Sequence, residues 1–472
     1  MEPKYISDSE NNADIFLVST IDREERIHVF WRETINDGEI TRTLIFHRTL
    51  EGSEWSEPVD IIAPSDTNIV SFVDVEIDDQ NDINLIWVGS QGARKDLFLS
   101  KAPGCCSLSS QKWQTQSLYS SQIAVGYATI EAGPGGRLHV AFSADNAVVL
   151  YLYSDDYGKT WARPDQVWSV MDPRESAIFG ATALAVDDQG NPHITWAVSS
   201  SDRNWNPDAI WYSRHLDTNR AWQTDRIIKS TPDEPTNAWS DLIVRNGHEI
   251  HLVWSRGVGS WDGRYHTWSP DYGTTWSTPQ IIQPDLSGQT FLPGLNLDSS
   301  SRIHLVTGAA SGVYDGETRP THLVWDGVSW SQPESLRPYG EHVAAVIRGG
   351  NELFVFWQAH LSFAPLVTRI AYSRKTLDTP RMEPASTIVP SVTEADTGSL
   401  ENQVSSELVI DKSFDDVSRP STADNPAIEP NANWQDNPRV HVPPAMPLVM
   451  AILSSFAVVA IVVFWSVRQK GR

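Results

Sequence analysis

Short apolar runs separated by polar turns fill the chain as far as about residue 378, and one run recurs seven times. Each copy ends in Trp or a substitute for it, and successive copies start 50 to 58 residues apart. Self-similarity at this period indicates one supersecondary unit repeated along the chain. The copies are Ile27–Trp31, Ile83–Trp87, Leu138–Phe142, Pro192–Trp196, Ile250–Trp254, Ile303–Thr307 and Leu353–Trp357.

The segments around each copy predict three further strands per repeat. Most copies follow an apolar run and a tight polar turn, as in Leu184–Gly190, where Asp and Gly suit a hairpin. A third run and a weaker fourth run come next, such as Tyr265–Trp268 and Gln280–Ile282. Four short strands per repeat are the unit of a propeller blade. We therefore predict an all-β, seven-bladed β-propeller over residues 1–378, with Lys4–Ser7 pairing with the last blade to close the ring.

The turn after the third strand carries the most specific motif. Ser154–Trp161 and Ser269–Trp276 both match S-x-D-x-G-x-T-W. Gly permits a positive φ there, the Asp and Thr side chains can bond turn amides, and the Trp can pack on outer strands. The motif resembles the Asp box of the sialidase (BNR-repeat) superfamily. The resemblance implies a structural role far from the central site for Asp156, Gly158, Trp161, Asp271, Gly273 and Trp276.

The resemblance to sialidases covers about residues 13–378. It implies a central site with three arginines for a sugar carboxylate, a Tyr nucleophile with a Glu, and an Asp as acid/base. It also makes a six-bladed, sialidase-type ring the alternative fold. The family's Arg-Ile-Pro motif is absent, and no Tyr/Glu pair can be assigned by motif. The fold therefore transfers better than the chemistry.

Candidate site residues come from the loops expected at one face of the ring. Arginines converging from separate blades would suit a carboxylate ligand, although a solvated loop arginine is the commoner state of any single one. The ligand-binding candidates are Arg32, Arg203, Arg256 and Arg319. The catalytic candidates, chosen by position, are Tyr127, Asp202 and Asp241.

Charge and composition exclude several classes. A net charge of −24 argues against nucleic acid as a partner, because phosphate binding needs clustered Lys and Arg. The only cysteines, Cys105 and Cys106, are adjacent and are not expected to form a disulfide. Five copies carry His at their second position, which we interpret as a ring of half-buried imidazoles. We predict no metal site and no cofactor.

The C-terminal region changes character. Residues 379–447 are rich in Pro, Ser, Thr, Asp, Glu and Asn, which predicts a disordered acidic stalk. Residues 448–467 contain no charge and match the thickness of a bilayer, and residues 468–472 are basic. We predict a single-pass cell-membrane protein with a cytoplasmic tail and the propeller outside. The first residues do not resemble a secretory signal.

Two functions compete at this point. The first is a surface propeller that recognises a glycan or a surface protein, and the second is an exo-α-sialidase-type glycoside hydrolase at the cell surface. Whether the chain is an enzyme stays open. A structural ectodomain is a third, weaker possibility.

Overall fold

The computed structural model describes most of the first 382 residues. The described ranges are 4–7, 13–36, 41–62, 69–91, 94–172, 174–176, 182–216, 221–231, 233–257, 261–287, 293–311, 318–336, 339–363 and 366–382. One compact unit spans Met1–Ala385, and a second spans Ser386–Arg472. Residues 383–472 lie outside the described residues, and with them most of the predicted stalk, the membrane helix and the basic tail. No described helix is long and apolar enough to cross a membrane.

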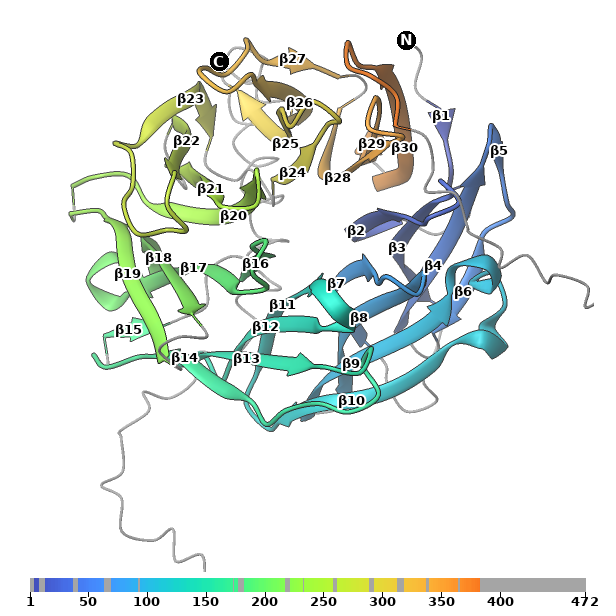
Figure 1. Cartoon of the computed structure of the whole chain (residues 1–472), viewed down its shortest axis with the longest axis horizontal. Coiled ribbons are helices and arrows are strands. Elements are labelled where there is room, and N and C mark those ends of the chain that lie inside the picture. Colours follow the sequence, from blue (N-terminus) through green and yellow to red (C-terminus); the bar gives the residue numbers. More distant parts are fainter. Residues whose placement is uncertain are drawn as a thin grey trace, which may run out of the picture. The chain divides into compact units, whose positions relative to one another are not determined.

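The described strands form seven antiparallel blades around a centre, so the seven-bladed prediction is confirmed and the six-bladed alternative is wrong (Figure 1). The inner strands are β2 (Ala13–Ile21), β7 (Ile69–Ile77), β11 (Val125–Ala132), β16 (Ala183–Val186), β20 (Asn237–Arg245), β24 (Gly294–Leu297) and β28 (Gly340–Arg348). The second strands, which contain the recurring run, are β3 (Ile27–Asn36), β8 (Asp82–Gln91), β12 (Leu138–Ala144), β17 (Pro192–Ser200), β21 (Glu249–Arg256), β25 (Ile303–Ser311) and β29 (Glu352–Phe363).

The third and outer strands complete each blade. The third strands are β4 (Thr41–Glu51), β9 (Arg94–Pro103), β13 (Val148–Ser154), β18 (Asn206–Leu216), β22 (Trp261–Ser269), β26 (Thr318–Trp325) and β30 (Leu366–Thr376). The outer strands of blades one to six are β5 (Glu54–Trp55) with β6 (Val59–Ile62), β10 (Gln114–Ser121), β14 (Asp165–Ser169), β19 (Ala221–Lys229), β23 (Gln280–Ser287) and β27 (Glu334–Ser335). A short extra strand, β15 (Glu175–Ser176), pairs with β17. The described helices are single 3-10 turns at Gly104–Cys106, Ser110–Lys112, Pro134–Gly136 and Ser201–Arg203.

The N-terminus closes the ring as predicted. Strand β1 (Lys4–Tyr5) pairs with β30 of blade seven, and the Ile6 amide donates to the Ile370 carbonyl at 2.9 Å. The Ile370 amide in turn donates to the Ser7 hydroxyl at 2.7 Å. Blade seven thus takes its fourth strand from the other end of the sequence, which covers an edge that would otherwise be exposed.

The aromatic residue at the end of the recurring run packs against the preceding blade. Trp87 of blade two, for example, is fully buried with Phe30 and Ile45 of blade one. Trp254 of blade five is buried with Ile210 and Tyr212 of blade four. The core is therefore a series of interfaces between blades, and six of the seven are closed by one large aromatic side chain.

The two matched turns have the hydrogen bonds expected of them. In blade three the Gly158 amide donates to Ser154 Oγ and the Thr160 amide to Asp156 Oδ1, both at 2.8 Å. In blade five the Gly273 amide donates to Ser269 Oγ and the Thr275 amide to Asp271 Oδ1, both at 2.8 Å. The two glycines have φ of 80° and 77°, a region that favours glycine. These carboxylates hold their own turns.

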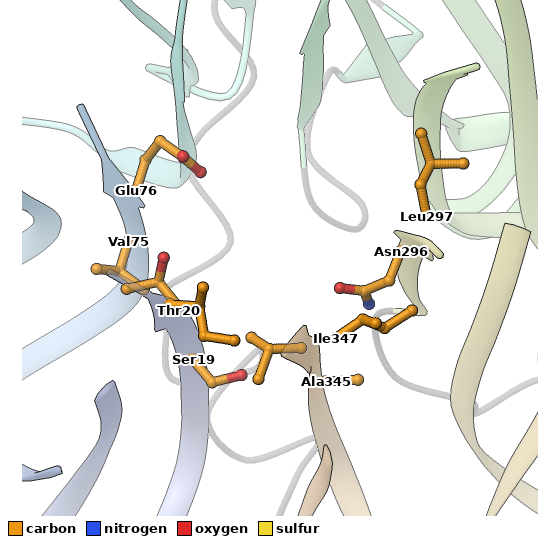
Figure 2. Close-up of a pocket in the computed structure, with 10 residues that line it drawn as sticks. Ser19, Thr20, Val75, Glu76, Asn296, Leu297, Ala345 and Ile347 are labelled. Carbon is orange, nitrogen blue, oxygen red and sulfur yellow. The ribbon is translucent and has the colours of Figure 1, made fainter. Parts of the chain in front are cut away.

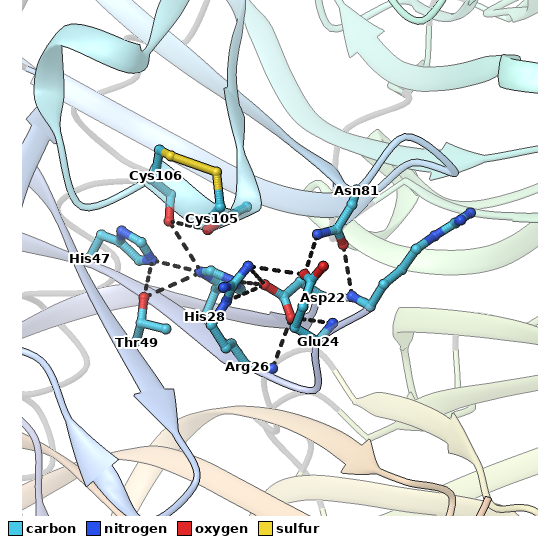
Figure 3. A network of polar contacts seen from close by, with 12 residues as sticks. Asp22, Glu24, Arg26, His28, His47, Thr49, Asn81, Cys105 and Cys106 are labelled. Atoms are coloured by element: carbon cyan, nitrogen blue, oxygen red, sulfur yellow. Dashed lines mark hydrogen bonds and ion pairs between the residues drawn. A yellow bond between two sulfur atoms is a disulfide. The ribbon is translucent and has the colours of Figure 1, made fainter. Parts of the chain in front are cut away.

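The repeated histidines are fully buried rather than half-buried. In blade one His28 Nδ1 lies 3.1 Å from His47 Nε2, and its Nε2 lies 3.1 Å from Asp22 Oδ2 (Figure 3). The repeated histidine meets another histidine of the third strand in blades five and six, and a tyrosine hydroxyl in blades three and four. His28 also lies 3.4 Å from Ser107 Oγ of blade two, whereas these other contacts stay within one blade. Among the described residues, no group of three His, Cys, Asp or Glu is arranged to hold a metal ion.

The cysteine prediction is wrong. Cys105 and Cys106 are joined by a disulfide in the 3-10 turn after β9, close to the histidine pair of blade one (Figure 3). The tight turn brings the two neighbouring side chains together. Beside it, the outer surface between blades one and two has a hollow of about 520 Å³ lined by Arg26, Thr49, Trp55 and Cys105 among others.

Candidate functional site

The inner strands carry bulges at a common level near one end of the channel. The pairing of five of them with their second strands shifts register there, in β2, β7, β11, β20 and β28. A bulge turns an extra side chain out of the regular sheet. Trp239 and His342, at two of these shifts, have φ of 52° and 49°, which is uncommon for residues other than glycine.

Side chains from three blades that are not neighbours meet at this level. The rings of Tyr127 in blade three and Trp239 in blade five lie 5.9 Å apart, edge to face. The inner strand of blade four lies between them in chain order, so the contact is made across the channel. Arg32 of blade one packs over the Phe16 ring at 4.5 Å, and its charge reaches the Tyr127 hydroxyl. We call Phe16, Arg32, Tyr127 and Trp239 the channel mouth.

The electrostatics of the channel mouth favour a neutral phenol. Burial raises the pKa of Tyr127, and the nearby Arg32 charge offsets only part of that rise. A phenol with a raised pKa keeps its proton at neutral pH. Tyr127 is thus suited to stacking and to donating a hydrogen bond, and poorly suited to attack as a phenolate.

Two aspartates below the mouth each accept a hydrogen bond from the next blade. Asp74 of β7 accepts hydrogen bonds from Thr129 Oγ1 at 2.9 Å and from the Ile130 amide at 3.0 Å in blade three. Asp241 of β20 accepts from the Leu242 amide at 2.8 Å and from the Leu295 amide of blade six. Burial raises the pKa of Asp74 to about 6 and that of Asp241 to about 7, and these hydrogen bonds limit the rise.

Two glutamates continue this acidic lining. Burial, together with the charges of Asp74 and Asp78, raises the pKa of Glu76 to about 8. Burial and the Glu76 charge raise the pKa of Glu131 well above its usual value. Glu76 also lines a cavity of about 270 Å³ at the hairpin end of the channel, where Figure 2 shows it across from Asn296. The channel is therefore acidic, and part of its acid groups keep their protons at neutral pH.

The structure separates the four predicted arginines into three places. Arg32 is at the channel mouth. Arg203 donates to the Glu234 carbonyl at 2.6 Å, and Arg256 lies 3.6 Å from the Glu234 carboxylate, so these two meet at one loop. Arg319 packs over the Tyr339 ring at 5.3 Å.

The three catalytic candidates are also dispersed. Tyr127 is at the channel mouth and Asp241 lies below it. Asp202 is an exposed residue 3.5 Å from Arg174. The predicted roles of these residues and of the four arginines stay predictions.

Sequence reasoning missed Phe16, Glu76, Glu131 and Arg264. The first three lie on inner strands, where the regular alternation gives no sign that their side chains line the channel. Arg264 is different, because a comparison of the repeats does single it out. Its place in the third strand of blade five is occupied by an aliphatic residue in blades one to four and seven, and by Pro320 in blade six.

No family model and no curated protein sequence matches the chain. Solved structures do resemble it. An ulvan lyase described as a polysaccharide lyase, bound to a saccharide of glucuronic acid and sulfated rhamnose, has a TM-score of 0.55 at 12% identity, covering 78% of this chain and 95% of the lyase. A protein of unknown function from Dyadobacter fermentans has a TM-score of 0.49 at 14% identity, covering 80% and 98%. The NanB sialidase of Streptococcus pneumoniae has a TM-score of 0.44 at 10% identity, covering 79% and 70%. The likeness to the lyase shows a shared propeller fold.

Proposed function

We propose that this chain is a surface-exposed propeller that recognises an acidic glycan at the channel mouth. The observation that carries the proposal is the contact between the Tyr127 and Trp239 rings of two separate blades, with the Arg32 charge of a third blade acting on the Tyr127 hydroxyl. Aromatic rings offer flat apolar faces to a sugar ring, and a guanidinium pairs with a carboxylate through two parallel hydrogen bonds. The raised pKa of Asp74 and of Asp241 adds neutral acid groups beneath the mouth, which can donate as well as accept.

One solved structure that shares the propeller fold is a lyase seen with a uronic acid saccharide. That supports an acidic saccharide as the first ligand class to test, with a surface protein as the second. We further propose that residues 448–467 anchor the propeller to the cell membrane and that the stalk holds it outside. Protease added to intact cells is then expected to release the propeller by cutting within residues 379–447.

The competing proposal is an exo-α-sialidase-type hydrolase. The neutral Tyr127 phenol argues against it, since such an enzyme needs its tyrosine activated as a nucleophile. The half-protonated Asp241 argues for it, because a carboxyl with a pKa of about 7 suits acid/base catalysis. Turnover of a fluorogenic sialoside by the purified chain would favour the hydrolase over the recognition proposal.

Binding of glucuronate- and sialate-bearing oligosaccharides, measured by calorimetry on the purified chain, tests the recognition proposal. Arg32→Gln is expected to weaken binding by about 30-fold and Trp239→Ala by about 10-fold, because each removes one recognition element. Arg137→Gln is the matched control, because Arg137 packs over the Tyr153 ring at 5.1 Å away from the mouth. Variants of Arg203 and Arg256 test whether their loop belongs to the same site. Equal affinity of Arg32→Gln and the control would refute the proposal.

A further inference from the structure

The interface between blades five and six differs from the other six interfaces at matched positions. The last residue of the recurring run is a large aromatic residue in six blades and packs on the preceding blade. Blade six has Thr307 there, fully buried. Thr307 therefore takes up less volume in the interface with blade five than the indole or phenyl ring takes up at the matched position of the other blades.

A residue of the preceding blade faces this aromatic residue. In five of the blades that residue is aliphatic. In blades one to four and in blade seven it is Ile45, Leu97, Val149, Ile210 and Ile370, all buried. Blade five has Arg264, paired with Ser255 on one side and Gln283 on the other. The place of Gln283 is likewise apolar in blades one to four, where it is Ile62, Tyr119, Trp168 and Ile228.

Arg264 is buried without hydrogen bonds. It has no exposed surface, and within the described part of the chain its Nε, Nη1 and Nη2 atoms all lack a hydrogen-bond partner. Gln283 donates to Thr321 Oγ1 of blade six at 3.0 Å, while its own Oε1 lacks a partner. A buried guanidinium in this state destabilises the folded protein strongly unless something compensates its charge.

The nearest opposite charge is engaged elsewhere. Asp241 attracts Arg264, but its hydrogen bonds come from the Leu242 and Leu295 amides. Burial lowers the pKa of Arg264 to about 9, and the Asp241 charge offsets only part of that fall. At neutral pH the guanidinium is therefore still positive and under-compensated.

The space beside Arg264 suits a small guest. Replacing an indole by a threonine side chain removes more heavy atoms than the change from isoleucine to arginine adds, so these two positions hold about four heavy atoms fewer here than between blades four and five. Because Arg264 has no exposed surface, a sugar does not fit against it as it stands. The free groups on the guanidinium are all donors, so they select an acceptor that carries negative charge.

We propose that the interface between blades five and six binds one small anion of halide size, held by the Arg264 guanidinium in the space left by Thr307. The anion completes the interface where the other blades use an aromatic ring. This site shares Asp241 with the acidic lining beneath the channel mouth, but it is tested by halide binding and not by glycan affinity, so the two proposals can fail separately. Since the anion and the Asp241 carboxylate both compensate Arg264, protonation of Asp241 strengthens anion binding and anion binding favours protonation of Asp241.

Thermal unfolding of the full chain in sodium chloride and in sodium gluconate at equal ionic strength tests the site. We expect a saturable rise in Tm of about 2 °C in chloride, because a ligand that binds only the folded state stabilises it. Arg264→Met is expected to abolish this rise. Arg348→Met is the matched control, because Arg348 is also buried but bonds Glu352 at 2.8 Å, and it is expected to keep the rise.

A crystal soaked in bromide gives a second measurement that needs no variant. We expect an anomalous peak at the Arg264 guanidinium. Water in that place, a bromide peak without any dependence of Tm on halide, or an unchanged chloride effect in Arg264→Met would each overturn the proposal. If Arg264→Met does not fold, Arg264→Lys replaces it, and a weakened halide effect is expected because the ammonium lacks the planar set of donors.

Discussion

The interfaces on the two sides of blade five use the same strand positions for opposite purposes. Between blades four and five, Trp254 packs on Ile210, and His193 lies 2.6 Å from the Tyr212 hydroxyl. Between blades five and six, Thr307 takes the place of the tryptophan and Arg264 that of the isoleucine. His266 takes the place of Tyr212, and it lies 3.0 Å from His251.

The difference teaches how a repeat protein can carry a polar site within its core. Six interfaces define what the fold requires at each position, and the seventh departs from it at several matched positions at once. Outer strand β23 also pairs with β25 of blade six at Leu286 and Ser287, so backbone hydrogen bonds cross this interface. The added backbone pairing stabilises an interface that has lost its aromatic ring.

The largest expected effect is the loss of the closing aromatic residue. Trp254→Ala should lower the free energy of unfolding by about 3–5 kcal/mol, because it leaves a large cavity between blades four and five. Thr307→Ala should cost only about 1 kcal/mol at the matched position. Urea unfolding monitored by circular dichroism measures both. Equal costs would show that the two interfaces do not differ in packing.

Restoring the common pattern between blades five and six gives the next effect. Thr307→Trp alone should destabilise by about 1–3 kcal/mol, because the indole collides with the Arg264 side chain. Adding Arg264→Ile should recover that loss. A double-mutant cycle is expected to give a favourable coupling of at least about 1 kcal/mol between the two positions. Additive costs would mean that the two side chains do not share one space.

The blade pattern was predictable because each of its signals is local. Strand alternation, hairpin turns and the recurring run such as Ile250–Trp254 need only a few neighbouring residues to be recognised. The role of Lys4–Ser7 followed from counting, since blade seven lacked a fourth strand. The Cys105–Cys106 disulfide did not follow, because it depends on the local turn.

The candidate site was predictable only in part. Tyr127, Asp241 and Arg32 were placed near the channel from their positions at strand ends. Their contacts depend on bulges in the inner strands. A bulge shifts the strand register by one residue, and the alternation of apolar and polar residues in the sequence does not reveal it. Arg264 lies within a strand and not in a loop, and its strand position alone distinguishes it from the aliphatic residue of most other repeats.

The histidine pair gives the two interfaces different responses to pH. Burial lowers the pKa of His251 to about 2 and that of His266 to about 3, so both stay neutral in the folded protein. The unfolded chain binds protons near pH 6.5, so each such histidine removes about 2 kcal/mol of stability between pH 7 and pH 5. The His266→Tyr variant has the tyrosine that blade four has at Tyr212. Between pH 7 and pH 5 its free energy of unfolding should fall by about 2 kcal/mol less than that of the unmodified protein.

Urea unfolding at pH 7 and at pH 5 checks the histidine effect. The channel carboxyls act in the opposite direction, because a raised pKa favours the folded state at low pH, but they contribute equally to both proteins and cancel in the comparison. Tyr212→His is the reciprocal change and should increase the loss at pH 5. An identical loss in all three proteins would show that the pairs do not titrate as described.

The smallest expected effect concerns the turns at the outer end of the same two blades. In blade five, Asp271 accepts from Ser269 Oγ, the Thr275 amide and Thr275 Oγ1, each at 2.8 Å. Asp271→Ala should lower the free energy of unfolding by about 1 kcal/mol, because it leaves the turn amide without its acceptor. In blade six, Asp326 accepts only the Val328 and Ser329 amides, both at 2.8 Å, so Asp326→Ala should cost less. Neither variant should change glycan affinity or the chloride effect on Tm, since both turns lie away from the channel mouth and from Arg264. A loss of either property in Asp271→Ala would mean that the turn supports the sites as well as the blade.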